Sequence, residues 1–394
     1  MKQRVLLVNK FYYPRGGDCV CTINLERLLK EQGHEVAIYA MDYPENIESS
    51  YTPYFASTVD FSSGLGGKIK ALARVLGLGD IVKSFSHILD DFKPNVVHLQ
   101  NIHSYLSPRL AQLAHSRGIK VVWTLHDFKL ICPSYSCLRD GKPCELCFEN
   151  KINVIKTRCM KGSLVASAIA YIEALRWNRD VLERCVDKFI CPSKFMYEKM
   201  AGCGFNKHKL EQLCNFVDPD KCKSLPTERE NYYCYVGRLS REKGVETLLK
   251  VAAKLPYRLK IAGDGPLAED LKKRYASFSH IEFLGRLSAS QVGELLSKAR
   301  LLVMPSECYE NNPLGIIEAL CAGTPIVGAD IGGIPELVSE SSGRVYSAFD
   351  AESLSEVLTE MMALTFDYAE IRKESIERFS RETYYKDLIS MYER

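Results

Sequence analysis

The sequence predicts an α/β protein made of two doubly wound units, each with a parallel sheet covered by helices. Its 394 residues are enough for two domains with ample hydrophobic cores. Short continuous apolar runs, such as residues 4–8 (RVLLV) and 301–304 (LLVM), are typical of buried strands in a parallel sheet. Loops with glycine or proline follow these runs and lead into helical segments, which is the order of a βαβ unit.

The composition excludes several classes of protein. The formal net charge is only +3, so nothing indicates a nucleic-acid partner. The first residues hold only a short apolar run, too short for a secretory signal, and no run of about 18 apolar residues could span a membrane. Fifteen cysteines, an odd number without an export signal, indicate reduced thiols rather than a disulfide framework. We therefore expect a cytoplasmic protein.

The first half opens with a strand, a loop and a helix. The loop at residues 13–18 (YPRGGD) follows the strand at residues 4–8, and the helix runs to about residue 32. Gly16 and Gly17 would let a phosphate or a sugar approach the backbone closely, and a plain tight turn would also explain them. The G-x-G-x-x-G fingerprint does not follow this strand, which argues against a dinucleotide cofactor.

Two later strands of the first half end in polar side chains. One predicted strand, residues 95–99, is followed by Asn101 and His103, and a second, residues 121–125, is followed by His126. Ligands collect at the carboxyl ends of parallel strands, which makes His126 a candidate site residue. A histidine at such a place can also be a hydrogen-bonded residue of the core.

The segment at residues 68–89 combines basic and apolar residues at helical spacing. Such a helix could rest on an anionic membrane surface, so peripheral contact with the inner membrane is one alternative. Gly77 and Gly79 interrupt the pattern. We favour the other alternative, an amphipathic helix that packs on the core.

A cysteine-rich insert at residues 132–162 contains the spacing C-x6-C-x2-C-x11-C. A Cys-x2-Cys turn with two outlying thiolates suits a closed tetrahedral zinc site. Buried reduced cysteines would explain the same residues without a metal. The zinc alternative assigns one structural ion, with no part in any chemistry, to Cys137, Cys144, Cys147 and Cys159.

The segment at residues 301–338 carries the strongest functional signal. A strand ends at Pro305, and we expect a helix to start at Asn312 and Pro313, with the asparagine as cap and the proline at the first helical position. The next three backbone amides, those of residues 314–316, would then lie unpaired at a positive helix end. Such a helix end is a seat for phosphate.

Charged residues are expected around this seat. Glu310 precedes the helix and Glu318 lies one turn inside it, in apolar company that favours a hydroxyl or cationic partner. In the loop after the strand at residues 232–236, Gly237 allows close approach, and Arg238 and Lys243 add two cations. Cations of this kind stabilise a diphosphate that gains charge as its bond to a sugar breaks.

These segments resemble a known family. Glu310 and Glu318, seven residues apart and followed by AGTPIV, are similar to the E-x7-E signature of family 4 glycosyltransferases, which are retaining enzymes with the GT-B fold. Residues 237–244 (GRLSREKG) resemble the family element G-R-L-x-x-E-K-G. The resemblance covers nearly the whole chain and is strongest over residues 235–338. It implies two Rossmann-like doubly wound domains that face a cleft.

The resemblance also implies roles for single residues on the donor side. The donor is a nucleotide-diphosphate sugar. Glu318 binds the ribose and Glu310 the hydroxyls of the donor sugar. The diphosphate is held by two cations and two backbone amides: Arg238, Lys243, Leu314 and Gly315.

On the other side, the resemblance places His126 near the transferred sugar, and the Gly16–Gly17 loop faces the donor and the acceptor. Residues 1–217 form the acceptor-side domain, residues 218–375 the donor domain, and residues 376–394 a terminal helix that crosses back. No catalytic metal is implied. The acceptor is a glycan or a lipid-linked glycan. Two alternatives remain, a GT-B nucleotide-sugar epimerase and a non-catalytic partner protein that binds a nucleotide sugar.

Overall fold

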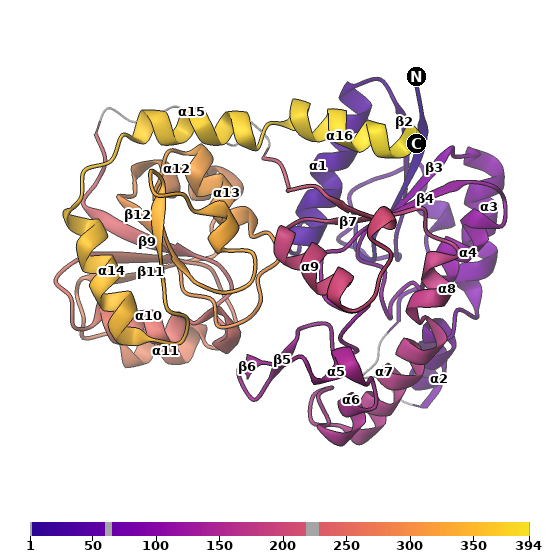
Figure 1. Cartoon of the computed structure of the whole chain (residues 1–394), viewed down its shortest axis with the longest axis horizontal. Coiled ribbons are helices and arrows are strands. Elements are labelled where there is room, and N and C mark those ends of the chain that lie inside the picture. The colour runs from indigo at the N-terminus through magenta and orange to yellow at the C-terminus, as the bar shows by residue number, and fades with distance from the viewer. Residues whose placement is uncertain (1, 60–64, 218–227, 394) are drawn as a thin grey trace. The chain divides into compact units, whose positions relative to one another are not determined.

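The computed structural model describes residues 2–59, 65–217 and 228–393 (Figure 1). The chain divides into two compact units. Unit 1 contains Met1–Cys137, Cys144–Leu213 and Tyr385–Arg394, and unit 2 contains Leu138–Pro143 and Cys214–Tyr384. Residue 218, the first residue of the predicted donor domain, lies outside the described residues.

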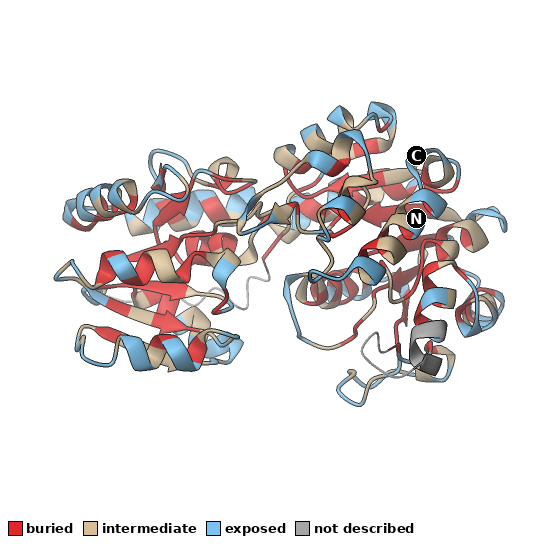
Figure 2. Ribbon diagram, turned by 90° about the horizontal axis from the view of Figure 1, so that it is seen from below, coloured by how far each residue is buried: buried red, intermediate tan, exposed pale blue. Residues whose placement is uncertain are grey.

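Unit 1 is built on a six-stranded, all-parallel sheet in the order β2-β1-β3-β4-β7-β8. Its central strands β1, β3 and β4 are buried on both faces, as their continuous apolar sequences predict, whereas the edge strand β8 is only partly buried (Figure 2). The strands are β1 (Arg4–Val8), β2 (Glu35–Tyr39), β3 (Val96–Leu99), β4 (Lys120–Thr124), β7 (Lys188–Cys191) and β8 (Leu210–Gln212).

Helices cover the unit 1 sheet. Helix α3 buries Ile81, Phe85, Ile88 and Phe92 along one face, so this part of the amphipathic segment packs on the core as expected. The helices are α1 (Gly17–Glu31), α2 (Leu65–Val75), α3 (Asp80–Phe92), α4 (Arg109–His115), α5 (Leu146–Glu149), α6 (Asn153–Lys156), α7 (Leu164–Arg176), α8 (Arg179–Glu183) and α9 (Lys194–Gly202).

Unit 2 is built on a second six-stranded parallel sheet, in the order β11-β10-β9-β12-β13-β14. This is the strand order 3-2-1-4-5-6 of a doubly wound nucleotide-binding fold. The strands are β9 (Tyr232–Val236), β10 (Arg258–Ala262), β11 (Ile281–Gly285), β12 (Leu301–Met304), β13 (Ile326–Ala329) and β14 (Gly343–Tyr346).

The helices of unit 2 form two groups. Helix α13 packs against α12 and α15, whereas α10 packs against α14, and Figure 1 shows the two groups on opposite faces of the sheet. The helices are α10 (Val245–Ala252), α11 (Ala268–Arg274), α12 (Ala289–Lys298), α13 (Leu314–Cys321), α14 (Ala351–Ala363) and α15 (Tyr368–Arg378). The last helix, α16 (Arg381–Glu393), begins in unit 2 and belongs to unit 1 from Tyr385 on.

The cysteine-rich insert follows β4. It contains a short antiparallel hairpin, β5 (Leu138–Arg139) and β6 (Lys142–Pro143), and then α5 and α6. Helix α6 packs against α7, which follows the insert. Within the ranges that the structure describes, no helix is both long and apolar enough to cross a bilayer.

Candidate active site

The candidate site of unit 2 lies at the ends of two neighbouring strands. In doubly wound sheets, ligands bind beyond the carboxyl ends of the strands at which the strand order reverses. The order of the unit 2 sheet reverses between β9 and β12. The loop after β9, residues 237–244, and the loop after β12, residues 305–313, therefore border the expected binding position.

An ion pair joins these two loops. Lys243 Nζ lies 2.6 Å from Glu310 Oε1, and both side chains are half-buried. Ser306 Oγ donates to the same oxygen at 2.6 Å. Burial alone would lower the pKa of Lys243, but the negative charge of Glu310 outweighs this effect and raises the pKa. Ser306 was not predicted, although a serine directly after a buried strand was a signal for it.

Helix α13 starts differently from the prediction. Leu314 is the first helical residue, and Pro313 precedes the helix with an extended ψ of 115° and no side-chain cap. The amide of Ile316 is bonded to the Pro313 carbonyl at 3.1 Å, so it is not part of the predicted phosphate seat. The amides of Leu314 and Gly315 stand at the start of the helix, where no preceding helical residue supplies a carbonyl partner.

The predicted cap, Asn312, has another partner. Its Oδ1 accepts from the backbone amide of Asn215 at 2.9 Å, and Asn215 Nδ2 donates to the Asn312 carbonyl at 3.1 Å. The Asn312 side chain also contacts the sulfur of Cys214. The cap prediction is therefore wrong, because this buried side chain is directed to the residues that open unit 2.

Two glycines fix the backbone of the unit 2 loops. Gly244 has a φ of +66°, and a Cβ there would lie 1.7 Å from the Pro305 carbonyl oxygen. Gly332 has a φ of +61°, and a Cβ there would lie 2.4 Å from the carbonyl oxygen of Glu310. The next amide, that of Gly333, donates to the same carbonyl at 2.7 Å. Glycine is needed at both positions. Gly332 packs against the backbone of Glu310, the carboxylate that pairs with Lys243.

The other predicted residues of unit 2 lie on these same elements. Gly237 directly follows β9, and a Cβ there would lie 2.9 Å from the hydroxyl of Tyr235. Arg238 is exposed, and its carbonyl accepts from that hydroxyl at 2.8 Å. Glu318 is half-buried on α13, one turn after Leu314. The structure thus places the predicted donor residues on two adjacent loops and one helix.

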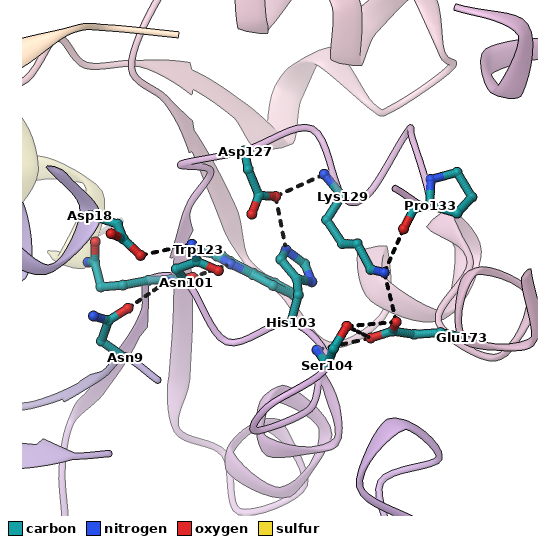
Figure 3. A network of polar contacts seen from close by, with 11 residues as sticks. Asn9, Asp18, Asn101, His103, Ser104, Trp123, Asp127, Lys129, Pro133 and Glu173 are labelled. Carbon is teal, nitrogen blue, oxygen red and sulfur yellow. Dashed lines mark hydrogen bonds and ion pairs between the residues drawn. The ribbon is translucent and has the colours of Figure 1, made fainter. Parts of the chain in front are cut away.

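Unit 1 carries a second polar cluster, at the ends of β1 and β3 (Figure 3). The strand order of this sheet also reverses there. Asn101 Nδ2 donates to Asp18 Oδ2 at 2.9 Å, and the Asn101 amide donates to Asn9 Oδ1 at 3.0 Å. Asp18 lies in the first turn of α1, which follows Gly16 and begins at Gly17. Gly16 is fully extended, with a φ of −159°, so no backbone strain requires glycine at this position.

Asp18 is held in its charged form. Burial would raise the pKa of its carboxyl, but the charge of Lys10 and the hydrogen bonds from Asn101 and the Cys19 amide lower it overall. This residue belongs to the predicted first loop, yet its side chain was not identified as a candidate from the sequence.

His126 is paired with a residue of the neighbouring strand end. Its Nε2 lies 2.7 Å from Gln100 Oε1, and because an amide oxygen only accepts, Nε2 carries the proton. Burial lowers the pKa of His126 and outweighs the opposing effect of Asp18, so the ring is neutral near pH 7. Two buried atoms beside this pair, Gln100 Nε2 and Asn101 Oδ1, have no hydrogen-bond partner among the described residues.

The other two histidines of this region belong to the core. His98 is buried between the hydroxyls of Tyr392, at 2.7 Å, and Thr124, at 2.8 Å. Its burial lowers its pKa to about 3. His103 is stacked on the Trp123 ring at 5.1 Å, and its burial also lowers its pKa to about 3. Both side chains are therefore neutral, and that of His98 is hydrogen-bonded at both ring nitrogens.

The structure does not confirm a metal site at the four predicted zinc ligands. Over the described ranges, no group of three or more His, Cys, Asp or Glu side chains could hold a metal ion, and Cys137, Cys144, Cys147 and Cys159 all lie within those ranges. Cys137 instead hydrogen-bonds to Cys132, which lowers the pKa of the Cys132 thiol to about 6. Burial and the neighbouring thiols Cys132, Cys159 and Cys144 raise the pKa of Cys147.

The two halves of the chain match two family models. Residues 217–380 match the model of glycosyl transferases group 1, and residues 15–221 match that of glycosyltransferase family 4. The second match covers more than half of the chain. The chain belongs to glycosyltransferase family 4. This assignment confirms the resemblance of its sequence motifs and makes the protein a glycosyltransferase.

Relatives and solved structures agree with this assignment. An uncharacterized 42.6 kDa protein in the cps region of Klebsiella pneumoniae is 25% identical over 370 residues, which are 90% of this chain and 92% of that protein. The structure resembles HepE of Anabaena in complex with UDP and glucose, with a TM-score of 0.67 at 15% identity and 98% coverage of both chains. It also resembles sucrose-phosphate synthase of Thermosynechococcus elongatus, with a TM-score of 0.69, 18% identity, and coverage of 100% and 98%. The predicted fold, GT-B, is thereby confirmed for this family 4 member.

Proposed function

We propose that this glycosyltransferase moves a sugar from a nucleotide-diphosphate sugar to an acceptor hydroxyl, with retention of anomeric configuration. The observation that carries the proposal is the Lys243–Glu310 pair, which lies at the strand-order reversal of unit 2 and is followed at once by the start of α13. A cation, a carboxylate and a helix N-terminus at one sheet edge provide partners for a phosphate and for hydroxyls together.

The diphosphate is assigned to the positive groups of this edge. Lys243 and Arg238 would neutralise its charge, and the amides of Leu314 and Gly315 would donate to its oxygens. Gly237, which has no side chain, would let the diphosphate approach the backbone at the carboxyl end of β9. As the bond from the anomeric carbon to the phosphate oxygen breaks, the phosphate gains charge, and these groups stabilise it. The acceptor oxygen bonds to the anomeric carbon on the same face, and its proton passes to the leaving phosphate.

The carboxylates are assigned to hydroxyl groups. Glu318 would accept from the ribose hydroxyls. Glu310 would accept from hydroxyls of the donor sugar, because its contacts with Lys243 and Ser306 both use Oε1 and, within the described part of the chain, its other oxygen has no partner. A charged acceptor that is already held in place loses little freedom when it binds such a hydroxyl.

Unit 1 is assigned to recognition of the transferred sugar and the acceptor. His126 would contact the sugar near the reacting carbon. The unpaired Gln100 Nε2 and Asn101 Oδ1 support this, since buried donors and acceptors without partners are costly, and sugar hydroxyls would satisfy both kinds. The Gly16–Gly17 loop begins α1 beside this cluster.

The acceptor is proposed to be a glycan or a lipid-linked glycan at the inner face of the cell membrane. The Klebsiella relative encoded in a cps region supports a place in bacterial polysaccharide synthesis. The family resemblance implies transfer without a metal cofactor. A structural zinc ion in the insert forms no part of the proposal, because the described residues show no group of three metal-ligating side chains.

The test is a calorimetric panel of nucleoside diphosphates and their sugars, followed by a hydrolysis and transfer assay for each compound that binds. Binding of one base series together with sugar transfer to an added acceptor supports the proposal. Turnover that needs no acceptor and yields an isomerised donor would favour an epimerase instead. Binding of a nucleotide sugar without turnover in the presence of any acceptor would favour the non-catalytic alternative. If no compound of the panel binds, the donor site is refuted.

A further inference from the structure

Helix α7 presents an apolar face to solvent. Four aliphatic side chains on it are exposed, among them Val165 at 70% and Leu175 at 50% of full exposure. The other two are Leu164 and Ile172. Positions 164, 165, 172 and 175 recur at the spacing of helical turns, so these four side chains share one face of the helix. A contiguous exposed apolar face of this kind marks an interaction surface.

The opposite side of α7 is fixed by buried polar contacts. Glu173 forms an ion pair with Lys129 at 2.8 Å and accepts hydrogen bonds from the amide and hydroxyl of Ser104 (Figure 3). At the end of the helix, Trp177 Nε1 donates to the Val75 carbonyl at 2.7 Å. Because these contacts set the rotation of α7 on unit 1, the apolar face is a fixed part of the surface.

Basic residues precede and follow this face along the chain. Between residues 151 and 178 the sequence has a single acidic residue, the buried Glu173. The exposed charged side chains of that stretch are all basic: Lys156, Arg158, Lys161 and Arg176. The next cation, Arg179, forms an ion pair with the exposed Asp180 at 3.1 Å. The surface therefore offers aliphatic groups for an apolar layer and positive charges for an anionic rim.

We infer that the α7 face docks on the surface of an anionic phospholipid bilayer. A helix that lies in the plane of a membrane inserts aliphatic side chains at the boundary of the acyl chains and places Lys and Arg among the headgroups. Negatively charged lipids attract basic residues that lie near the surface. The pattern of charge, rather than the apolar area alone, favours this occupant over a second protein.

The inference adds a membrane-binding surface to the proposed function, and it rests on residues that take no part in donor binding. Its test is sedimentation of the full-length protein with vesicles of phosphatidylcholine alone and with vesicles that also contain phosphatidylglycerol. We expect wild type to sediment with the second kind only, and added salt to weaken this binding by screening the charges. The same preparations are assayed with nucleotide sugar and a water-soluble acceptor, so that loss of folding or of catalysis is seen separately.

Two sets of variants decide the inference. The double variant Val165→Asp/Leu175→Asp should lower vesicle binding at least about tenfold, because burying a carboxylate among the acyl chains is unfavourable. Lys156→Gln with Lys161→Gln should remove the preference for anionic vesicles. The control Leu364→Asp, at an exposed leucine of unit 2, should bind as wild type does. Unchanged binding by the aspartate variant would overturn the inference. So would a wild-type dimer that this variant converts to a monomer, because the face would then be a self-association surface.

Discussion

Lys243 Nζ and Glu310 Oε1 lie 2.6 Å apart, although 67 residues of sequence separate them. The contact joins the loop after β9 to the loop after β12, the two strands between which the order of the unit 2 sheet reverses. The pair keeps Lys243 protonated, because the negative charge of Glu310 raises the pKa of the lysine. Each proposed donor-binding side chain therefore holds the other in place before a ligand arrives.

Removal of this lysine tests the diphosphate assignment. We expect Lys243→Ala to lower kcat about 10²-fold or more, because one charge that stabilises the leaving phosphate is lost. Lys250→Ala, at an exposed lysine of α10, should leave kcat unchanged. Steady-state kinetics with the donor found in the binding panel gives the comparison. Equal kcat values for the two variants would refute the role of Lys243.

The ribose assignment of Glu318 can be tested with altered nucleotides. Wild type should bind the ribose form of its nucleoside diphosphate at least about tenfold more tightly than the 2′,3′-dideoxy form, because a hydrogen bond to a charged group is lost. Glu318→Ala should bind both forms with nearly the same, weaker affinity. Isothermal titration calorimetry measures the four dissociation constants. A variant that still discriminates between the two nucleotides would show that another group binds the ribose.

The backbone of the unit 2 loops predicts a stability difference between two glycines. Gly244 and Gly118 have nearly the same φ, +66° and +71°, but a Cβ at Gly118 would meet no atom within 4 Å. Gly244→Ala should therefore lower the free energy of unfolding by at least about 2 kcal/mol more than Gly118→Ala, because the new methyl group overlaps the Pro305 carbonyl. Urea unfolding of both variants measures the difference. Equal losses would mean that the loops relax without cost.

The buried histidine His98 predicts how stability depends on pH. Burial lowers its pKa to about 3 in the folded protein. The unfolded chain takes up a proton on this residue below about pH 6.5, whereas the folded chain does not, so the free energy of unfolding falls as the pH is lowered toward 3. The expected contribution is up to about 1.4 kcal/mol per pH unit.

The measurement is urea unfolding between about pH 6 and about pH 5, where the unfolded side chain is charged. His98→Gln should show a shallower dependence on pH than wild type, even if the variant is less stable throughout. His87→Gln, at an exposed histidine of α3, should keep the wild-type slope. A His98 variant with the wild-type slope would contradict this account of the histidine.

The fold and the donor elements could be predicted because local sequence determines them. Continuous apolar runs gave the parallel strands, and the loops after β9 and β12 carry their charged residues in consecutive sequence. The cap of α13 could not be predicted, because Asn312 is directed to the amide of Asn215, which is 97 residues away in the sequence. Asn312 is of a residue type that often caps helices, but its side chain accepts a hydrogen bond from Asn215 instead.

The structure does not confirm the zinc hypothesis, for a related reason. The cysteine spacing describes how ligands could be arranged, but only the fold decides which thiols meet. Cys137 meets Cys132, which the predicted set did not include. The unit 1 cluster was predicted only in part, since His126 was identified but its partner Gln100 and the nearby Asp18 were not. Their roles follow from packing between strands that are distant in sequence.

The fit of Gly332 against the backbone of Glu310 has a consequence for how relatives of this enzyme are classified. A homologue with a larger residue at this position would keep both glutamates, the arginine and the lysine of the signature, yet its first glutamate would be displaced. Motif searches would count such a protein as an active transferase. On the role proposed for Glu310, glycine at this position together with the charged residues is the criterion that would separate working enzymes from inactive descendants.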